Sequence, residues 1–353
     1  MATYDSVRDL PLEIESYELE GLEATAGEDF RRLTTVVKLR GGGHEGVGED
    51  VTYSGEDQEA LQAEGPTLPL AGSHTLDSFS QLLGRLALFP SGPGMDAFLD
   101  YRRWAYESAA LDLALRQAGL SLAEAVGREP RPVTFVVSLR IEKPPAPDPV
   151  PLLLERYPEL RFKLDPTADW NAALIAALAD TGAVETLDLK GAYKGTPVDQ
   201  AGDPLLYGAV AQAFPSAWIE DPDLNDETDP VLEPHRERIT WDAPIHSVSD
   251  IVRLPFPPRA LNFKPSRFGS VQRLFDAYDH CAEHGIRMYG GGQWELGPGR
   301  GQIQHLASLF HAETPNDVAP AAWNLHRLDP PPGLPTSPLE PQPSETGFRW
   351  GER

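Results

Sequence analysis

The amino-acid sequence predicts a mixed α/β protein whose larger part is a barrel of parallel strands. The chain has 353 residues, enough for one barrel of roughly 250 residues with a smaller unit before it. From residue 131 onward, short apolar segments alternate with helical ones, which is typical of parallel βα units. Charged residues follow these apolar segments, and the carboxyl ends of barrel strands are where active sites form.

Composition narrows the possible partners. The formal net charge of −24 creates a surface that repels phosphate backbones and anionic lipid, so we expect no nucleic-acid or membrane partner. Residues 1–9 are polar and acidic, unlike a signal peptide, and no window holds about 18 consecutive apolar residues. These features predict a cytoplasmic protein. The single cysteine, Cys281, excludes an internal disulfide and favours a small buried side chain over a nucleophile.

The first part of the chain predicts an α+β unit. Residues 12–19 alternate in part between apolar and polar side chains, and residues 33–39 are β-branched and precede a glycine cluster, so we expect two strands. Helical patterns follow over residues 79–88 and 96–118. Gly119 stands where a left-handed residue commonly ends a helix.

The second part supplies the elements of a barrel. Strands are expected over residues 132–138, 160–165, 184–190, 218–220, 238–242, 260–264 and 286–289. Helices are expected over residues 170–179, 204–214 and 271–284. Residues 329–343 contain too many prolines for helix or sheet. They predict an extended tail, either disordered or packed back on the body.

Charged residues that could do chemistry lie at the ends of five of these strands. They are Lys163, Asp188, Glu220, Asp242 and Lys264. Successive ones are separated by roughly one βα unit of about 30 residues, so a closed barrel brings all five to one face. Three neighbouring carboxylates need a cation, and three oxygen ligands suit Mg²⁺ or Mn²⁺ better than zinc. A lysine near such a cation has a lowered pKa and can act as a general base.

Each of these residues also has an ordinary structural interpretation. A single acid at a strand end is more often solvated or a helix cap, and the two lysines could simply form salt bridges. The coincidence of three acids on successive strands favours a metal site over these alternatives.

Several short motifs follow one another in a consistent order. They are Gly46-Val-Gly-Glu-Asp, Tyr106-Glu-Ser-Ala-Ala-Leu-Asp, Arg161-Phe-Lys163, Asp188, Trp218-Ile-Glu220-Asp-Pro, Asp242-Ala-Pro-Ile-His-Ser, Lys264-Pro-Ser-Arg-Phe-Gly and Gly291-Gly-Gln-Trp-Glu295. Each is weak alone. In this order and spacing, they resemble the enolase superfamily over nearly the whole chain. The resemblance is to its mandelate racemase and muconate lactonizing branch, close to dipeptide epimerase and o-succinylbenzoate synthase.

The resemblance implies a modified TIM barrel, (β/α)₇β, with an N-terminal α+β capping domain. The capping domain would occupy residues 1–130 and the barrel residues 131–328, with a proline-rich tail over residues 329–353. The first glycine motif would form a turn of the cap. The family also implies Mg²⁺ (or Mn²⁺), a small-molecule carboxylate substrate and a homo-oligomer.

The reaction implied by the resemblance is removal of the proton α to a carboxylate, giving a metal-stabilised enediolate. Lys163 and Lys264 would be the acid/base residues, and Asp188, Glu220 and Asp242 the metal ligands. The residues expected to bind the substrate or to support the catalytic groups are Arg161, Lys190, Tyr53 and Glu295. We expect a racemase or epimerase. The alternatives are a dehydratase or cycloisomerase such as o-succinylbenzoate synthase, and a catalytically silent relative that only binds a metabolite.

The sequence departs from the family pattern at several positions. Arg161 replaces the first lysine of a Lys-x-Lys pair, Lys190 replaces an asparagine, and Ala243 replaces a glutamate. A different register would make Lys163 the first lysine and put Asp165 in the catalytic place. We favour the register with Lys163 as catalyst, because Leu164-Asp-Pro then falls where the family turns into its loop.

Specificity in this family resides in segments of the cap that close over the substrate. Here these segments are residues 21–29 and 51–56, which contain Glu23, Glu28, Asp29 and Tyr53. An acidic lid would favour a substrate with a cationic or polar distal end. An ordinary solvated surface is the alternative.

Overall fold

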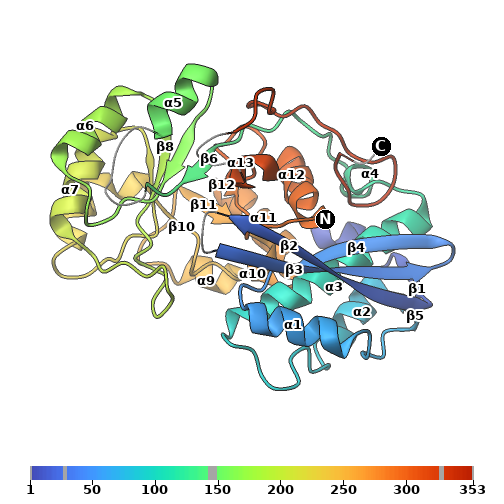
Figure 1. Cartoon of the computed structure of the whole chain (residues 1–353). Coiled ribbons are helices and arrows are strands. Elements are labelled where there is room, and N and C mark those ends of the chain that lie inside the picture. Colours follow the sequence, from blue (N-terminus) through green and yellow to red (C-terminus); the bar gives the residue numbers. More distant parts are fainter. Residues whose placement is uncertain (1, 27–29, 142–148, 326–329, 352–353) are drawn as a thin grey trace.

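The computed structural model describes residues 2–26, 30–141, 149–325 and 330–351. Figure 1 shows a layer of antiparallel strands and helices from the first third of the chain beside a curled sheet with helices around it. The predicted α+β cap and α/β barrel are both confirmed.

The cap is built on a three-stranded antiparallel sheet of consecutive strands. These are β2 (Ser16–Ala26), β3 (Phe30–Gly41) and β4 (His44–Asp50). A second small sheet pairs β1 (Pro11–Ile14) with β5 (Gly72–Thr75). The helices are η1 (Thr3–Ser6), α1 (Gly55–Glu64), α2 (Leu76–Leu83), α3 (Ala97–Ala118) and α4 (Leu122–Val126). As predicted, α3 ends at Gly119, whose φ of 68° is left-handed.

Two glycines let α3 pack directly on β4. A Cβ at Gly46 would lie 2.3 Å from the carbonyl oxygen of Ala109, and one at Gly48 would lie 2.0 Å from that of Ala105. The turn expected at this motif is therefore wrong, because the residues form strand β4. The glycines serve the close approach of a helix instead.

Glu49, in the same motif, joins the cap to the barrel. Its buried carboxylate accepts hydrogen bonds from the backbone N–H groups of Leu296, Gly297 and Gly299, at 2.6 to 3.1 Å. These groups begin helix α12 (Pro298–Phe310), where unpaired N–H groups favour an acidic partner. Glu49 thus fixes the loop between β12 (Arg287–Gly290) and α12.

The barrel sheet has seven parallel strands in sequential order. They are β6 (Val137–Leu139), β7 (Phe162–Leu164), β8 (Val184–Asp188), β9 (Trp218–Glu220), β10 (Ile239–Trp241), β11 (Ala260–Phe263) and β12 (Arg287–Gly290). Parallel bridges from Asn316 to Phe135 and from Asp317 to Gly291 connect the two edges. Residues 316–317 therefore stand in the place of an eighth strand and close the (β/α)₇β barrel.

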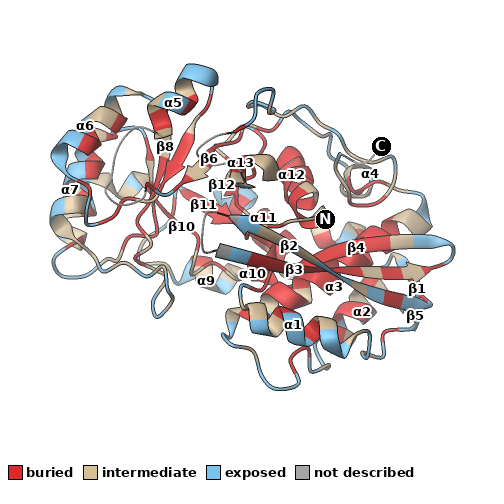
Figure 2. Cartoon of the chain, viewed as in Figure 1, coloured by how far each residue is buried: buried red, intermediate tan, exposed pale blue. Residues whose placement is uncertain are grey.

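Helices connect the strands and cover the outside of the barrel. They are α5 (Pro149–Arg156), α6 (Ala172–Asp180), α7 (Pro204–Ala213), α8 (Asp229–Leu232), η2 (Glu233–Arg238), α9 (Val248–Val252), α10 (Pro265–Phe268), α11 (Val271–His284), α12 and α13 (Ala321–Leu325). Figure 2 shows the barrel strands largely buried and the outer faces of α6 and α7 exposed.

Cys281 on α11 is fully buried, as expected for a lone cysteine, and burial raises the pKa of its thiol to about 12.

The proline-rich tail packs back on the body over residues 330–351. Phe348 is fully buried, and its backbone N–H donates to Asp112 Oδ1 of α3 at 2.7 Å. Arg349 donates from Nε to Asp112 Oδ2, also at 2.7 Å, and from Nη2 to the carbonyl of Glu45. Of the two expectations for the tail, the packed one describes these residues.

The tail also contacts the barrel. The ring of His305, on α12, lies 5.9 Å from that of Phe348 and 6.0 Å from that of Trp350. The tail therefore touches both cap and barrel.

Within the ranges that the structure describes, no helix combines the length and apolar character needed to cross a membrane.

Candidate active site

Three buried carboxylates meet at the carboxyl ends of neighbouring barrel strands. Asp188 ends β8, Glu220 ends β9, and Asp242 follows β10. One oxygen from each lies within 4.8 Å of the others, and all three residues are fully buried. Parallel pairing puts Asp188 directly beside Glu220. The barrel thus brings together the three acids that the sequence places at successive strand ends; we call them the acidic triad.

The two lysines of the predicted site lie against different members of the acidic triad. Lys163 Nζ lies 3.0 Å from Asp188 Oδ2 and also contacts Glu220 Oε1. Lys264 Nζ lies 2.7 Å from Asp242 Oδ2. Burial lowers the pKa of Lys163, but the nearby carboxylates outweigh it and raise the pKa well above its ordinary value.

Gly291, in the seventh-strand motif, makes room for Lys264. A Cβ at Gly291 would lie 2.8 Å from Lys264 Cε and 2.7 Å from Asn262 Oδ1. Any larger residue there would push the lysine stem away from the acidic triad. This is a local reason for glycine in the Gly291-Gly-Gln sequence.

Asp242 is surrounded by hydrogen-bond donors on one side. Tyr193 donates its hydroxyl to Asp242 Oδ2 at 2.6 Å, and Arg267 Nε lies 3.3 Å from Oδ1. Burial raises the pKa of Asp242, but Arg267 and Lys264 outweigh it and hold the pKa well below its ordinary value. Arg267 also donates to the carbonyl of Ala243, the position where the family pattern has glutamate.

Asp221 fixes the backbone of Asp242. It has a left-handed backbone, with φ of 49°, and its carboxylate accepts the backbone N–H groups of Asp242 and Ala243, each at 2.9 Å. Burial and the neighbouring acids raise its pKa to about 7. Sequence reasoning missed Asp221, Tyr193 and Arg267 as parts of the site. For two of them a signal exists, because Asp221 and Arg267 lie inside the motifs that carry Glu220 and Lys264.

The acidic triad fits a divalent cation. Its donors are carboxylate oxygens, which hard cations prefer. Asp242 Oδ1 is buried and accepts no hydrogen bond from the described part of the chain. Burial, with Asp188 and Asp242 close by, raises the pKa of Glu220 to about 8 despite Lys163. A cation among the three oxygens would offset the mutual repulsion of these carboxylates.

Lys190 also reaches the acidic triad. It adopts a left-handed backbone just after β8, with φ of 56°. Its Nζ contacts Asp188 Oδ2, lies 3.8 Å from Asp165 Oδ1, and lies 4.9 Å from the ring centre of Tyr193. The position that replaces a family asparagine thus adds a third lysine to the site.

Arg161 points away from the acidic triad, unlike Lys163. Its side chain is 38% exposed and Nε lies 3.9 Å from Glu185. The register between β7 and β8 shifts between Phe162 and Lys163, which separates Arg161 from the inward-facing Lys163. Asp165 also lies near the site, because its Oδ1 is 3.8 Å from Lys190 Nζ. Lys163 and Asp165, which take the catalytic place in the two alternative registers, are therefore both close to the acidic triad.

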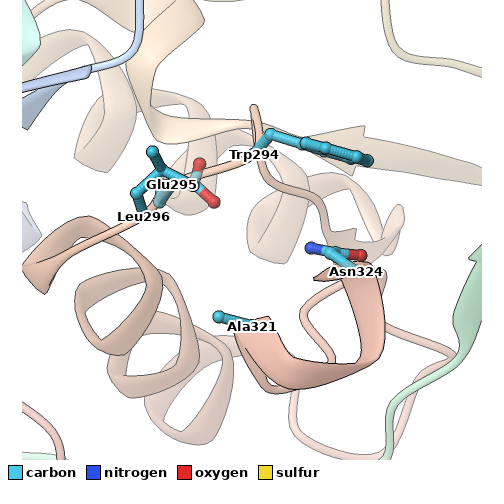
Figure 3. A pocket seen from close by; sticks show the side chains of 5 residues that line it. All are labelled: Trp294, Glu295, Leu296, Ala321 and Asn324. Atoms are coloured by element: carbon cyan, nitrogen blue, oxygen red, sulfur yellow. The ribbon is translucent and has the colours of Figure 1, made fainter. Parts of the chain in front are cut away.

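Tyr53 and Glu295 have partners outside the acidic triad. The ring of Tyr53, which is 43% exposed, lies 4.3 Å from the guanidinium of Arg32. Glu295 accepts the backbone N–H of Gln293 at 2.6 Å and lies 2.9 Å from Arg300. Figure 3 shows Glu295 beside a small pocket, which is lined by Trp294, Glu295, Leu296, Ala321 and Asn324.

The expected lid is only partly a loop. Residues 21–26 continue strand β2, contrary to expectation, because they pair with residues 30–35 of β3. Glu23 is exposed and lies 2.9 Å from Arg31. Glu28 and Asp29 lie outside the described residues.

Comparisons with known proteins agree with this architecture. The model of the N-terminal domain of a domain of unknown function (DUF8230) matches residues 5–125, and the model of its C-terminal domain matches residues 129–325. An o-succinylbenzoate synthase of Bacillus subtilis is 27% identical over 233 residues, or 64% of this chain. The alignment covers 61% of that protein's length. An N-succinylamino acid racemase of Thermus thermophilus is 26% identical, over 85% of this chain and 82% of its own.

Solved structures show the same fold. A dipeptide epimerase of Enterococcus faecalis superposes with a TM-score of 0.68 at 17% identity, over 96% of this chain and 99% of its own. A muconate cycloisomerase of Pseudomonas fluorescens gives 0.63 at 17% identity, over 97% and 95%. The two domain models together cover most of the sequence, and the fold neighbours include a protein described as an enolase superfamily member. The chain therefore belongs to the DUF8230 family, and it has the fold of structures described as enolase superfamily members.

Proposed function

We propose that the protein is a Mg²⁺-dependent enzyme that removes the proton α to the carboxylate of a small molecule and returns a proton to the same carbon. The result is racemisation or epimerisation. The observation that carries this proposal is the placement of Lys163 and Lys264 against different members of one buried acidic triad.

The chemistry needs both parts of the site. A proton α to a carboxylate is weakly acidic, so its removal requires strong stabilisation of the developing charge. When held by Asp188, Glu220 and Asp242, a divalent cation supplies this stabilisation as a Lewis acid. The lysines supply the proton transfers, and each must be neutral to accept a proton. The acids that keep Lys163 charged are the ones that such a cation would neutralise.

Inversion at carbon needs an acid/base group on each side of the substrate. Lys163 would act from the side of Asp188 and Glu220, and Lys264 from the side of Asp242. One lysine would take the proton from one enantiomer, and the other lysine would take it from the mirror image. Relatives named as a racemase and as an epimerase support this outcome.

A lyase reaction on the same site is the second candidate. The similarity to an o-succinylbenzoate synthase favours it. In a syn elimination or cycloisomerisation, one lysine would move the proton and the other would hold the developing charge by its cationic head. A relative that binds a metabolite without turning it over is a third possibility, motivated by Lys190 and Ala243.

Proton NMR in D₂O tests these possibilities. The protein with Mg²⁺ is incubated with pools of amino-acid derivatives, dipeptides, acid sugars and succinylbenzoate precursors. We expect the α-proton signal of one pool to disappear without a new compound. A new product would replace the racemase proposal by the lyase. Exchange in no pool, although Mg²⁺ binds, would contradict both and favour the binding-only relative.

Single-lysine variants sharpen the test once a substrate is found. With racemisation, Lys163→Ala and Lys264→Ala should each stop exchange from one enantiomer and retain it from the other. Lys194→Ala is the matched control, because Lys194 is 56% exposed and pairs with Asp223 at 2.8 Å. Full activity of Lys264→Ala with both enantiomers would contradict its assignment as a base.

A further inference from the structure

Lys190 is a charged group beside the acidic triad that the proposed reaction does not use. Its Nζ shares Asp188 Oδ2 with Lys163, but only Lys163 has a second triad member, Glu220, as a partner. A cation bound at Asp188 would compete with Lys190 for the same oxygen. It would also repel the ammonium group, because like charges a few ångströms apart in a buried site interact strongly.

A second acceptor stands next to Lys190. Asp165 follows β7, and its Oδ1 lies 3.8 Å from Lys190 Nζ. That oxygen is buried and accepts no hydrogen bond from the residues that the structure describes. A displaced ammonium group therefore has a carboxylate within a short movement, and the movement would give this buried oxygen a hydrogen-bond donor.

The backbone of Lys190 is held by hydrogen bonds, and its ammonium group lies between the two acids. The Lys190 N–H donates to Asp188 Oδ1 at 3.2 Å, and the Lys190 carbonyl accepts from Tyr193 and Gln200, each at 3.3 Å. The ring centre of Tyr193 lies 4.9 Å from Lys190 Nζ. Both carboxylates can thus be reached from one fixed backbone position.

We propose that Lys190 occupies Asp188 when no divalent cation is bound and transfers to Asp165 when the cation arrives. Lys190 weakens cation binding by competing for Asp188, and Asp165 limits that cost by accepting the displaced lysine. This inference rests on the proposed metal site, and it makes the affinity of that site depend on two residues that do not bind the metal.

The test is a double-mutant cycle on Mn²⁺ affinity in the full chain, measured by isothermal titration calorimetry and by the EPR signal of free Mn²⁺. Lys190→Gln should bind Mn²⁺ about tenfold more tightly than the unaltered protein, and Asp165→Asn about fivefold more weakly. In the double variant, the Asp165 change should have no further effect, so its affinity should equal that of Lys190→Gln within about twofold.

Controls separate this mechanism from a general charge effect. Lys194→Gln removes one positive charge from the same loop and should leave Mn²⁺ affinity unchanged, since Lys194 pairs with Asp223 instead. Asp165→Ser serves as a second variant if Asp165→Asn does not fold. Circular dichroism of every variant checks that the fold is intact.

Two results would overturn the proposal. Lys190→Gln could bind Mn²⁺ no more tightly than Lys194→Gln, which would mean that Lys190 does not compete. Asp165→Asn could weaken binding equally with and without Lys190, which would mean that Asp165 does not act by receiving the lysine. Failure of the unaltered protein and all variants to bind Mn²⁺ would instead remove the metal site, and with it the proposed function.

Discussion

Asp112 of α3 and Asp242 of the acidic triad are both buried, but their carboxylates are compensated differently: both oxygens of Asp112 accept hydrogen bonds, whereas Asp242 Oδ1 accepts none from the described residues. Its Oδ1 accepts the N–H of Phe348 at 2.7 Å and Nε of Arg116 at 3.4 Å. Its Oδ2 accepts the N–H of Val47 at 2.9 Å and Nε of Arg349 at 2.7 Å. Both oxygens are satisfied, so Asp112 ties together the strand, the helix and the tail.

The acidic triad has cationic neighbours, but they compensate its carboxylates unevenly. Asp242 Oδ1 accepts no hydrogen bond from the described residues, although Arg267 Nε lies 3.3 Å away, and the pKa of Glu220 is raised to about 8. Such an arrangement costs stability, because buried charges need compensation. The comparison indicates that a buried acid whose oxygens all accept hydrogen bonds stabilises the fold. A cluster in which one buried oxygen accepts none is suited to binding a cation.

The largest effect on activity is expected from Glu220→Gln in the acidic triad. Exchange activity should fall about 10²–10³-fold, as when one preorganised stabilising group is removed. The cation-free variant should nevertheless lose little stability, because the raised pKa of Glu220 favours its neutral form and Lys163 keeps Asp188 as a partner. Thermal unfolding with and without Mg²⁺ measures both points, and Mg²⁺ should raise the melting temperature of the unaltered protein only. A strongly destabilised, cation-free Glu220→Gln would contradict the contrast.

Asp112→Ala should act on stability instead. Removing one partner of a buried ion pair costs about 3–5 kcal/mol, since Arg349 would keep its charge in a largely buried place. The loss should be the same with and without Mg²⁺. Urea unfolding measures it, and Asp112→Asn, which keeps the shape and loses the charge, is the matched control. A loss that Mg²⁺ restores would place Asp112 with the cation site.

The histidine beneath the tail should make stability depend on pH. Burial lowers the pKa of His305 to about 4 from an unfolded value of 6.5, so the unfolded chain binds more protons between these values. Its contribution is fully present above pH 6.5 and is lost as pH falls towards 4, by roughly 3 kcal/mol at most. Urea unfolding at pH 7, 5.5 and 4.5 should show a smaller decline in His305→Leu. The exposed His284→Leu is the control, and equal slopes in all three proteins would refute the assignment.

The smallest effect is expected at an exposed ion pair. Arg131 Nη1 lies 2.8 Å from Glu313 Oε1, nearly as close as the Arg349–Asp112 pair, but the Glu313 side chain is 81% exposed. Glu313→Ala should change the free energy of unfolding by about 1 kcal/mol or less, because water screens such pairs. Urea unfolding measures the change, and added salt should shrink it further. A loss comparable with that of Asp112→Ala would show that distance, and not burial, governs these contacts.

The features that local patterns control could be predicted from the sequence. The end of α3 at Gly119 needs only a left-handed residue after a helical pattern. The meeting of Asp188, Glu220 and Asp242 needs only strands of regular spacing in a closed barrel. The roles of these acids and of the two lysines remain proposals, since their placement alone does not establish chemistry.

The features that depend on backbone irregularity or distant contacts could not be predicted. Arg161 faces outward beside a register shift in the pairing of β7 with β8, and no residue type in the sequence predicts such a shift. Asp221 supports Asp242 only because it adopts a positive φ. The tail's place depends on Asp112, more than 200 positions earlier in the chain, and a proline-rich composition does not reveal that partner.

The contacts of Phe348 and Arg349 have a consequence for how the protein is made. On a ribosome, these residues emerge after every element that they touch, including β4 and α3. Synthesis at about 5–20 residues per second leaves the earlier elements many seconds to fold without them. During that interval Asp112 lacks two of its donors, so the contact between cap and tail is completed only after translation has passed residue 349.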